Sequence, residues 1–306
     1  MPQSVTRDDE SPVKRDARAV DNVYPGIATS DGAGVKLRRY IGSHALDYLD
    51  PFLLLDEFSS NNPRDYIAGF PPHPHRGMET VTYMLDGHVQ HGDSLGNRGV
   101  ISKGDAQWMT AGSGIIHSEM PAMENGLLRG LQLWVNLSAK NKMNQPHYRE
   151  LKAAAIPKVA IENGTVAVIA GSYNGIASAF VDIAGNPLYL DVSLNSGAAF
   201  TVDVPVSHNA FVYVLEGKGR FGSNNTSASK QSLVVFKRDD LPALSADASD
   251  GELRFIVAAG EPLKEPVARG GPFVMNTEAQ IRTAWIEYQN GNFIKAEARV
   301  EERTEQ

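Results

Sequence analysis

Two short motifs, about forty residues apart, each place two potential metal ligands at positions i and i+2. His73 and His75 form the first pair, and His117 and Glu119 form the second. In a β-strand, side chains two residues apart lie on the same face. On neighbouring strands the two motifs would direct three imidazoles and one carboxylate to a single point. Because three of the eight histidines fall in these motifs, the spacing predicts a metal site.

A second carboxylate competes for the fourth ligand position. Glu79 follows the first histidine pair at an even spacing, so an unbroken strand would place it on the same face as both imidazoles. From spacing alone, Glu79 and Glu119 are therefore both candidates. Pro72 and Pro74 lack backbone donors, which predicts that this strand begins at a sheet edge or in a bulge. Candidates to hydrogen-bond the ligands from behind are Asp93, Gln107 and Gln132.

The composition restricts the ligand chemistry and excludes several classes of protein. The chain of 306 residues has 42% hydrophobic and 21% charged residues, the balance of a globular protein. A prior of roughly 150 residues per domain suggests two domains. Cysteine is absent, so ligands must be histidine or carboxylate, which suits iron, manganese, nickel, copper, cobalt or zinc. The net charge of −7 argues against direct nucleic-acid binding, which relies on attraction to phosphates.

The start of the given sequence is not expected to act as a targeting signal. Residues 1–20 are charged and poor in large apolar side chains, which predicts a flexible arm rather than a signal peptide. No stretch reaches the ~20 apolar residues that a membrane helix needs. We therefore expect a cytoplasmic protein without membrane contact.

Short apolar segments punctuated by glycine and proline predict an all-β chain. The segment 141–157 is instead interpreted as a loop with a short helix. Near the end, Thr277 and Gln280 have the spacing of a capping box and Gly291 is a stop signal, which predicts a short C-terminal helix. The expected strands include 34–41, 79–87, 99–110 and 127–137.

The second half of the chain repeats the pattern of the first. AFVYVLEG aligns with TVTYMLDG and places Tyr213 on Tyr83. GELRFIVAAGEP aligns with NGLLRGLQLWVN after a shift of one residue, which places Arg254 on Arg129. Two matches in the same order predict an internal duplication, hence two β-barrels or sandwiches in tandem.

The second copy does not repeat the ligands. Asp203, Pro205 and Asn209 stand where the first copy has its two histidines and Glu79, and His208 is the only histidine beyond residue 147. The predicted metal site therefore exists once. The second barrel is expected to be structural or to bind something else.

Three longer stretches extend these motifs: HPHRGMETVTYMLDG, HGDSLGNRGVISKGDAQWMTAGSGIIHSEMP and GGPFVMNT. Together they resemble the pirin family, and the resemblance runs from about residue 20 to 295. It implies an all-β bicupin, two tandem cupin β-barrels with a short C-terminal helix. The expected divisions are a flexible arm (1–20), an N-terminal barrel with the metal site (21–140), a connector that begins the second barrel (141–187), a C-terminal barrel without metal (188–265) and a helical C-terminal segment (266–306).

The resemblance also distinguishes the two carboxylates. Cupins usually take this ligand from the first motif, here Glu79, whereas pirin-like proteins take it from the second. It thus implies His73, His75, His117 and Glu119 as ligands, with Glu79 nearby. The implied cofactor is one divalent metal ion, with Fe(II) favoured over Mn, Ni, Co, Cu or Zn. The implied activity is that of a quercetin 2,3-dioxygenase, which opens the ring of a flavonol with O₂ and releases CO, while Glu119 or Glu79 accepts the 3-hydroxyl proton.

Pirin-like proteins also suggest a function without turnover. The alternative is a metal-loaded, redox-sensing regulator that binds a protein partner, as a transcription co-regulator or a modulator of a metabolic enzyme. Oxygen uptake with a flavonol would distinguish the first hypothesis from the second. A cupin isomerase or sugar-binding relative is a third hypothesis, which the position of the carboxylate disfavours.

Overall fold

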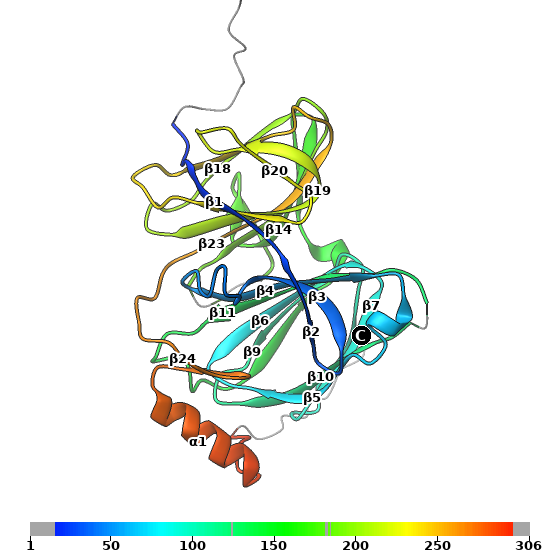
Figure 1. Cartoon of the computed structure of the whole chain (residues 1–306), viewed down its shortest axis with the longest axis vertical. Helices are drawn as coiled ribbons and strands as arrows, with labels where there is room; N and C mark the ends of the chain where they lie inside the picture. Colours follow the sequence, from blue (N-terminus) through cyan, green and yellow to red (C-terminus); the bar gives the residue numbers. More distant parts are fainter. Residues whose placement is uncertain (1–15, 124, 181–182, 184, 296–306) are drawn as a thin grey trace, which may run out of the picture.

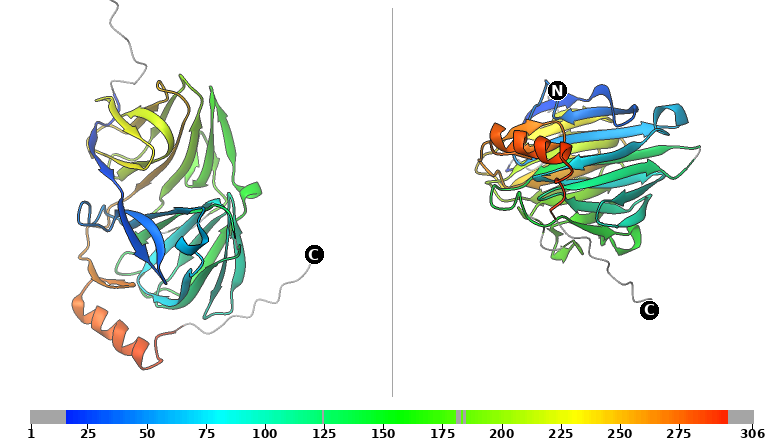
Figure 2. Two further views of the ribbon diagram at one scale, coloured as in Figure 1. Left: turned by 45° about the vertical axis from the view of Figure 1, so that its right-hand side comes forward. Right: turned by 90° about the horizontal axis from the view of Figure 1, so that it is seen from below.

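The computed structural model describes residues 16–123, 125–180, 183 and 185–295. Strands dominate, and they form two units stacked along the long axis of the molecule, with a helix packed at one end (Figures 1 and 2). The predicted all-β architecture with a short C-terminal helix is confirmed. Within the described ranges, no helix has the length and apolar character that a membrane crossing requires.

The first unit consists of a seven-stranded and a four-stranded antiparallel sheet. The larger sheet contains β2 (Ile27–Asp31), β3 (Val35–Ile41), β4 (Phe52–Ser60), β6 (Met78–Asp86), β9 (Ala106–Thr110), β11 (Leu128–Asn136) and β12 (His147–Leu151). Their order is β12-β9-β6-β11-β4-β3-β2. The smaller sheet, ordered β5-β10-β7-β8, contains β5 (Phe70–His75), β7 (His88–Asp93), β8 (Arg98–Ser102) and β10 (Ile115–Pro121).

The second unit is built around a ten-stranded sheet. Its strands are β1 (Val20–Pro25), β13 (Lys158–Ile161), β14 (Gly164–Ala170), β17 (Leu188–Leu194), β18 (Ala199–Asp203), β19 (Asn209–Phe221), β20 (Thr226–Ser229), β21 (Ser232–Phe236), β22 (Ala243–Asp247) and β23 (Leu253–Gly260). The shorter elements are η1 (Pro63–Asp65), η2 (Ala153–Ala155), β15 (Ser172–Tyr173), β16 (Ile176–Ala177), β24 (Ala268–Gly270), β25 (Phe273–Met275) and α1 (Glu278–Gln289).

Both ends of the described chain cross to the opposite unit. Strand β1 pairs with β21 of the second unit, although residues 21–140 were expected to form the first barrel. At the other end, β24, β25 and α1 pack beside β5 (Figure 1). A parallel bridge between Arg76 and Phe273 makes this contact. The local hydrophobic pattern does not predict these pairings, because they depend on contacts between residues far apart in the sequence.

The last residues of the predicted flexible arm are anchored rather than flexible. Residues 1–15 lie outside the described part of the chain, but Arg18 is fully buried. Its guanidinium donates to the carbonyls of Leu241, His208 and Pro205 at 2.7–2.8 Å. Residues 17–20 are therefore anchored to the second unit, since a buried guanidinium needs such acceptors.

Two other boundaries differ from the sequence prediction. The stretch 99–110 is divided by a turn into β8 and β9, because Asp105 accepts the backbone N–H of Ser102. The stretch 141–157 contains the strand β12 and only a short 3₁₀ turn. The C-terminal helix begins as predicted, with Thr277 and Gln280 forming a capping box.

Two equivalent hydrogen-bond networks join the two units, and the first is centred on Asp191. Tyr83 of the first unit donates its hydroxyl proton to Asp191 of the second at 2.7 Å. Asp191 is also held by Arg254 of its own unit, at 2.6 Å. Because burial raises the pKa of the Tyr83 hydroxyl well above its ordinary value, this phenol stays protonated and remains a donor.

The second network has the same form with the units exchanged. Tyr213 of the second unit donates to Glu57 of the first at 2.8 Å, and Arg129 of the first unit pairs with Glu57 at 2.8 Å. Tyr83 pairs with Leu131 across β6 and β11, as Tyr213 pairs with Ile256 across β19 and β23. The register therefore supports the alignment of the two halves inferred from sequence.

Candidate metal centre

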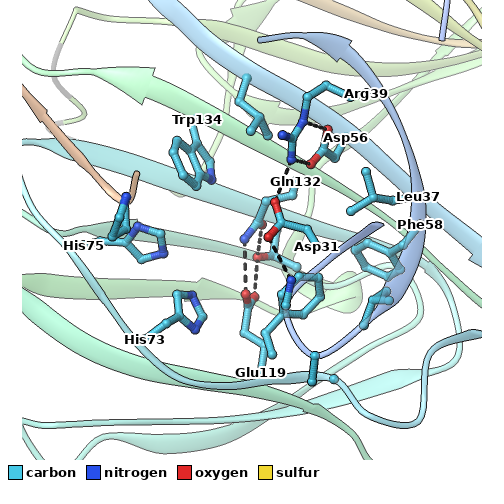
Figure 3. Close-up of a pocket in the computed structure, with 18 of the residues that line it drawn as sticks. Asp31, Leu37, Arg39, Asp56, Phe58, His73, His75, Glu119, Gln132 and Trp134 are labelled. Atoms are coloured by element: carbon cyan, nitrogen blue, oxygen red, sulfur yellow. Dashed lines mark hydrogen bonds and ion pairs between the residues drawn. The ribbon is translucent and has the colours of Figure 1, made fainter. Parts of the chain in front are cut away.

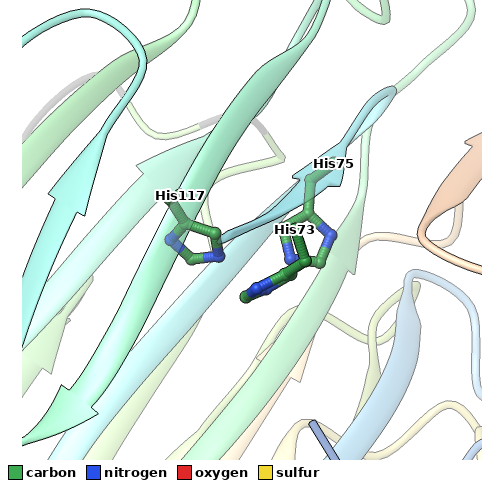
Figure 4. A group of neighbouring side chains, drawn as sticks. All are labelled: His73, His75 and His117. Atoms are coloured by element: carbon green, nitrogen blue, oxygen red, sulfur yellow. The ribbon is translucent and has the colours of Figure 1, made fainter. Parts of the chain in front are cut away.

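Strands β5 and β10 bring the two ligand motifs together. They pair antiparallel, and His117 lies directly opposite His73. The ring centroids of His73, His75 and His117 are 4.5–5.0 Å apart, and one nitrogen from each ring lies within 4.8 Å of the others (Figure 4). This group of three imidazoles could hold a metal ion.

The first motif lies on an edge strand, as its two prolines predicted. β5 is the edge strand of its sheet, where Pro72 and Pro74 need not donate to a neighbour. The β5–β10 register shifts between His117 and Glu119, so this pair contains an irregularity. The β7–β10 register stays regular over the same residues. The second motif is therefore supported by a regular ladder on one side only.

Burial keeps two of the imidazoles neutral. His75 and His117 are each 2% exposed, and burial lowers both pKa values well below the ordinary range. Electrostatic repulsion between the neighbouring imidazoles, when protonated, lowers both pKa values further. A neutral imidazole keeps the lone pair that a metal requires. The electrostatics thus favour metal binding over protonation.

Several ring nitrogens have no hydrogen-bond partner among the described residues. Nδ1 of His75 and Nε2 of His117 are buried and unpartnered. Nδ1 of His73 lies 2.8 Å from the carbonyl of Pro71, which assigns the proton to Nδ1 and leaves Nε2 for a ligand bond. Since buried polar atoms are almost always satisfied, these nitrogens fit a bound metal ion.

Glu119 lies beside the histidines but outside the group of three. Its carboxylate is 6% exposed, accepts a hydrogen bond from the Thr82 hydroxyl at 3.1 Å and another from the Gln132 amide at 3.2 Å (Figure 3). Burial raises the pKa of Glu119, and the charge of His73 opposes that shift. Gln132, one of the predicted supporting residues, therefore orients this carboxylate.

Glu79 is held elsewhere in the first unit. The hydroxyl of Thr110 donates to its Oε1 at 2.6 Å, and the side chain is 2% exposed. Burial raises its pKa. Glu79 does not line the cavity in front of the histidines, whereas Glu119 does. The two candidate carboxylates thus lie in different environments.

Tyr148 is a site residue that the sequence analysis missed. Its hydroxyl lies 3.3 Å from Nδ1 of His117, whose Nε2 has no hydrogen-bond partner among the described residues. Tyr148 lies on β12, the strand that was expected to be a loop, which is why alternation was not applied to it. The other predicted supports bind elsewhere. Asp93 accepts from Leu95 and Asn97, and Gln107 donates to Glu150.

Arg76, the residue after His75, contacts the C-terminal segment. It is 2% exposed, and its guanidinium pairs with Glu287 of α1 at 2.7 Å. It also donates to the carbonyls of Ser113 and Phe293, and it lies over the ring of Phe293. Arg76 therefore anchors the C-terminal segment to the strand that carries the first motif.

A cavity of about 650 Å³ opens in front of His73, His75 and Glu119. That volume suits a small organic ligand. Trp134 lines it and packs edge-on against His75, with ring centroids 5.1 Å apart. His117 instead lines a second cavity of about 460 Å³, together with residues of β7. The first cavity is mainly apolar, and its walls include Leu54, Phe70 and Val274. Leu37 and Phe58 also line it (Figure 3).

Two cupin-like units, with a cluster of three imidazoles in the first, define a bicupin with a candidate metal centre. Sequence comparison agrees. Residues 34–135 match the family model described as Pirin, and residues 189–294 match that described as the Pirin C-terminal cupin domain. The chain belongs to the pirin family.

The relatives cover most of the chain. A pirin-like protein of Solanum lycopersicum is 46% identical over 266 residues, covering 86% of this chain and 89% of the relative. Pirin of Homo sapiens is 43% identical over 265 residues, covering 85% and 89%. The crystal structure of a quercetin 2,3-dioxygenase from Acinetobacter baumannii superposes with a TM-score of 0.83 at 34% identity, covering 90% of this chain and 98% of that one.

Proposed function

We propose that this protein is a metal-dependent dioxygenase that opens the heterocyclic ring of flavonols such as quercetin. The observation that carries the proposal is the position of the histidine cluster, two of whose imidazoles, His73 and His75, line one end of a mainly apolar cavity. A similar structure from Acinetobacter baumannii is named quercetin 2,3-dioxygenase, which supports the same substrate class.

The proposed ligands are His73, His75, His117 and Glu119. Three neutral imidazoles and one carboxylate suit a divalent ion with open coordination positions, and Fe(II) is the proposed metal. When bound, the metal supplies a Lewis acid and a redox centre for reaction with O₂. Tyr148 fixes the tautomer of His117 through its contact with Nδ1.

Glu119 is the proposed proton acceptor for the flavonol 3-hydroxyl. Its carboxylate lines the cavity beside His73 and His75, where a bound flavonol would bring this hydroxyl within hydrogen-bond reach. Thr82 and Gln132 hold the carboxylate at the cavity wall. The aromatic walls, including Trp134 and Phe58, exclude water from the bound flavonol. Glu79 has no direct role in this scheme.

The test combines elemental analysis of the purified protein with oxygen uptake and CO release in the presence of quercetin. The expected result is oxygen consumption that His73→Ala abolishes and that a control variant outside the histidine cluster, His88→Ala on β7, retains. A metal-loaded protein that consumed no oxygen with flavonols would refute the dioxygenase. It would instead have the behaviour expected of a metal-loaded regulator that binds a protein partner.

A further inference from the structure

A charged cluster lies in the wall of the cavity at the end away from the histidines. Arg39 donates to both carboxylate oxygens of Asp56, at 2.9 and 2.7 Å, and to Asp31 at 2.8 Å. All three residues line the cavity, and Figure 3 shows them across it from His73 and His75. A ligand that reached the histidines with one end could meet this cluster with the other.

The cluster contains two carboxylates and one guanidinium. Asp56 is 4% exposed and engages Arg39 in a bidentate pair, so it serves as an anchor. The positive charge of Arg39 is therefore already shared by two acids. An anionic substituent would meet excess negative charge here, whereas a neutral hydrogen-bond donor would not.

Asp31 is the accessible acceptor of the cluster. Its side chain is 53% exposed, while that of Asp56 is 6% exposed. One oxygen of Asp31 accepts the backbone N–H of Gly32 and the other accepts from Arg39. A carboxylate has about four lone-pair positions, so Asp31 retains capacity for a hydroxyl donor on each oxygen.

The space between the two polar ends suits a flat aromatic molecule. Leu37 and Phe58 form apolar walls beside the cluster, and Trp134 forms one beside His75 (Figure 3). A ligand with an apolar, aromatic middle and polar groups at both ends matches this order of surfaces.

We propose that Asp31, held in place by Arg39 and Asp56, is a specificity-determining residue that binds a phenolic hydroxyl on the ring remote from the histidines. The proposal rests on the proposed function, and it narrows the substrate class to flavonols hydroxylated on their pendant ring. Arg39 and Asp56 are positioning residues for Asp31.

The test compares two flavonols, quercetin and galangin, which differ only in the hydroxyls of the pendant ring. Their affinities for the metal-loaded protein are measured by titration without oxygen, so that turnover does not interfere. The variants are Asp31→Ala and the conservative Asp31→Asn. The matched control is Asp86→Ala, because Asp86 also precedes a glycine at a strand end, accepts that glycine's N–H and pairs with a cation, Lys103, but lies outside the cavity lining.

The wild-type protein is expected to bind quercetin at least about tenfold more tightly than galangin, the effect of one hydrogen bond to a charged group. Asp31→Ala should remove this preference, Asp31→Asn should leave part of it and Asp86→Ala should preserve it. Equal affinities in the wild type, or an unchanged preference in Asp31→Ala, would overturn the proposal.

Oxygen uptake, measured separately, distinguishes the two proposals. A preference for quercetin that depends on Asp31, without oxygen uptake, would refute the dioxygenase and leave the hydroxyl-binding residue in place. Oxygen uptake with equal affinity for the two flavonols would support the dioxygenase and refute the role of Asp31. If neither flavonol bound, both proposals would be wrong.

Discussion

The two barrels share a strand pattern but use their interiors differently. The interior of the first contains imidazoles, carboxylates and a cavity of about 650 Å³. The second is filled by an apolar cluster in which the ring centroids of Phe200 and Phe221 lie 5.6 and 5.8 Å from that of Phe255. The cavity and polar side chains of the first barrel occupy space that apolar side chains fill in the second. The filled barrel and the interface between the units supply packing that the hollow barrel lacks.

The two units contribute equivalent contacts to the interface between them. Tyr83 and Tyr213 occupy equivalent register positions, and each crosses to a carboxylate in the other unit. The apolar cluster at this interface also draws residues from both units, among them Phe52 and Phe211, whose rings pack edge to face. The duplicated halves thus retain their common contacts while their interiors differ.

The largest effect is expected from removing a ligand in the first barrel. His117→Ala should reduce metal affinity by more than ~100-fold, because loss of a mere supporting partner already costs 10–100-fold. His208→Gln, at the second barrel's lone histidine, should leave the metal content unchanged. Elemental analysis after dialysis measures both. Equal metal loss in the two variants would contradict the assignment of the site to one barrel.

Core truncation should separate the filled barrel from the hollow one. Phe255→Ala should lower the free energy of unfolding by about 3–5 kcal/mol, because its ring is fully buried among other rings. Phe58→Ala should cost less, since Phe58 already borders the cavity, but it should weaken flavonol binding. Urea denaturation and ligand titration give the two readouts. A larger stability loss from Phe58→Ala than from Phe255→Ala would contradict the view that the second barrel is the more tightly packed.

The interface should respond to matched changes in the two networks. Tyr83→Phe and Tyr213→Phe each remove a hydroxyl that donates to a buried carboxylate, so each should destabilise the protein by about 1.5–3 kcal/mol. Tyr213→Phe should cost more, because Tyr213 also shares a hydrogen bond with Tyr40 at 3.0 Å. Urea denaturation measures the difference. No loss in either variant would mean that the networks do not stabilise the interface.

A smaller effect distinguishes the buried cations associated with each barrel. Lys142, beside the first barrel, donates to Gly77, Asn136 and Val274 at 2.6–3.0 Å, and burial lowers its pKa to about 8. Arg18, against the second barrel, stays protonated in this range. Between pH 8 and the ordinary lysine pKa of about 10.4, the unfolded chain binds more protons at Lys142 than the folded chain. Stability should therefore gain up to about 1.4 kcal/mol per pH unit from this residue as pH rises.

The measurement is urea denaturation of the wild type and of Lys142→Met across that pH range. The difference in stability between the two proteins should move in favour of the wild type as pH rises. An unchanged difference would show that the ammonium group is not destabilised by burial.

Local patterns in the sequence were sufficient for several features. The i, i+2 spacing placed His73 and His75 on one face, because alternation in a strand is a local property. The cap formed by Thr277 and Gln280 was readable for the same reason. His117 joins His73 and His75 only through the pairing of β10 with β5. The single site and the duplication followed from comparing the two halves of the chain.

Tertiary structure decided which distant residues meet. Tyr148 reaches His117 only because β12 pairs with β9, and Asp31 faces the cavity only because β2 forms the end of the same sheet. It also placed Glu119 on the cavity wall and Glu79 outside its lining, although alternation treated them alike. Strand pairing, bulges and the crossing of the chain ends depend on contacts between residues far apart in sequence. A period of two residues carries no information about those contacts.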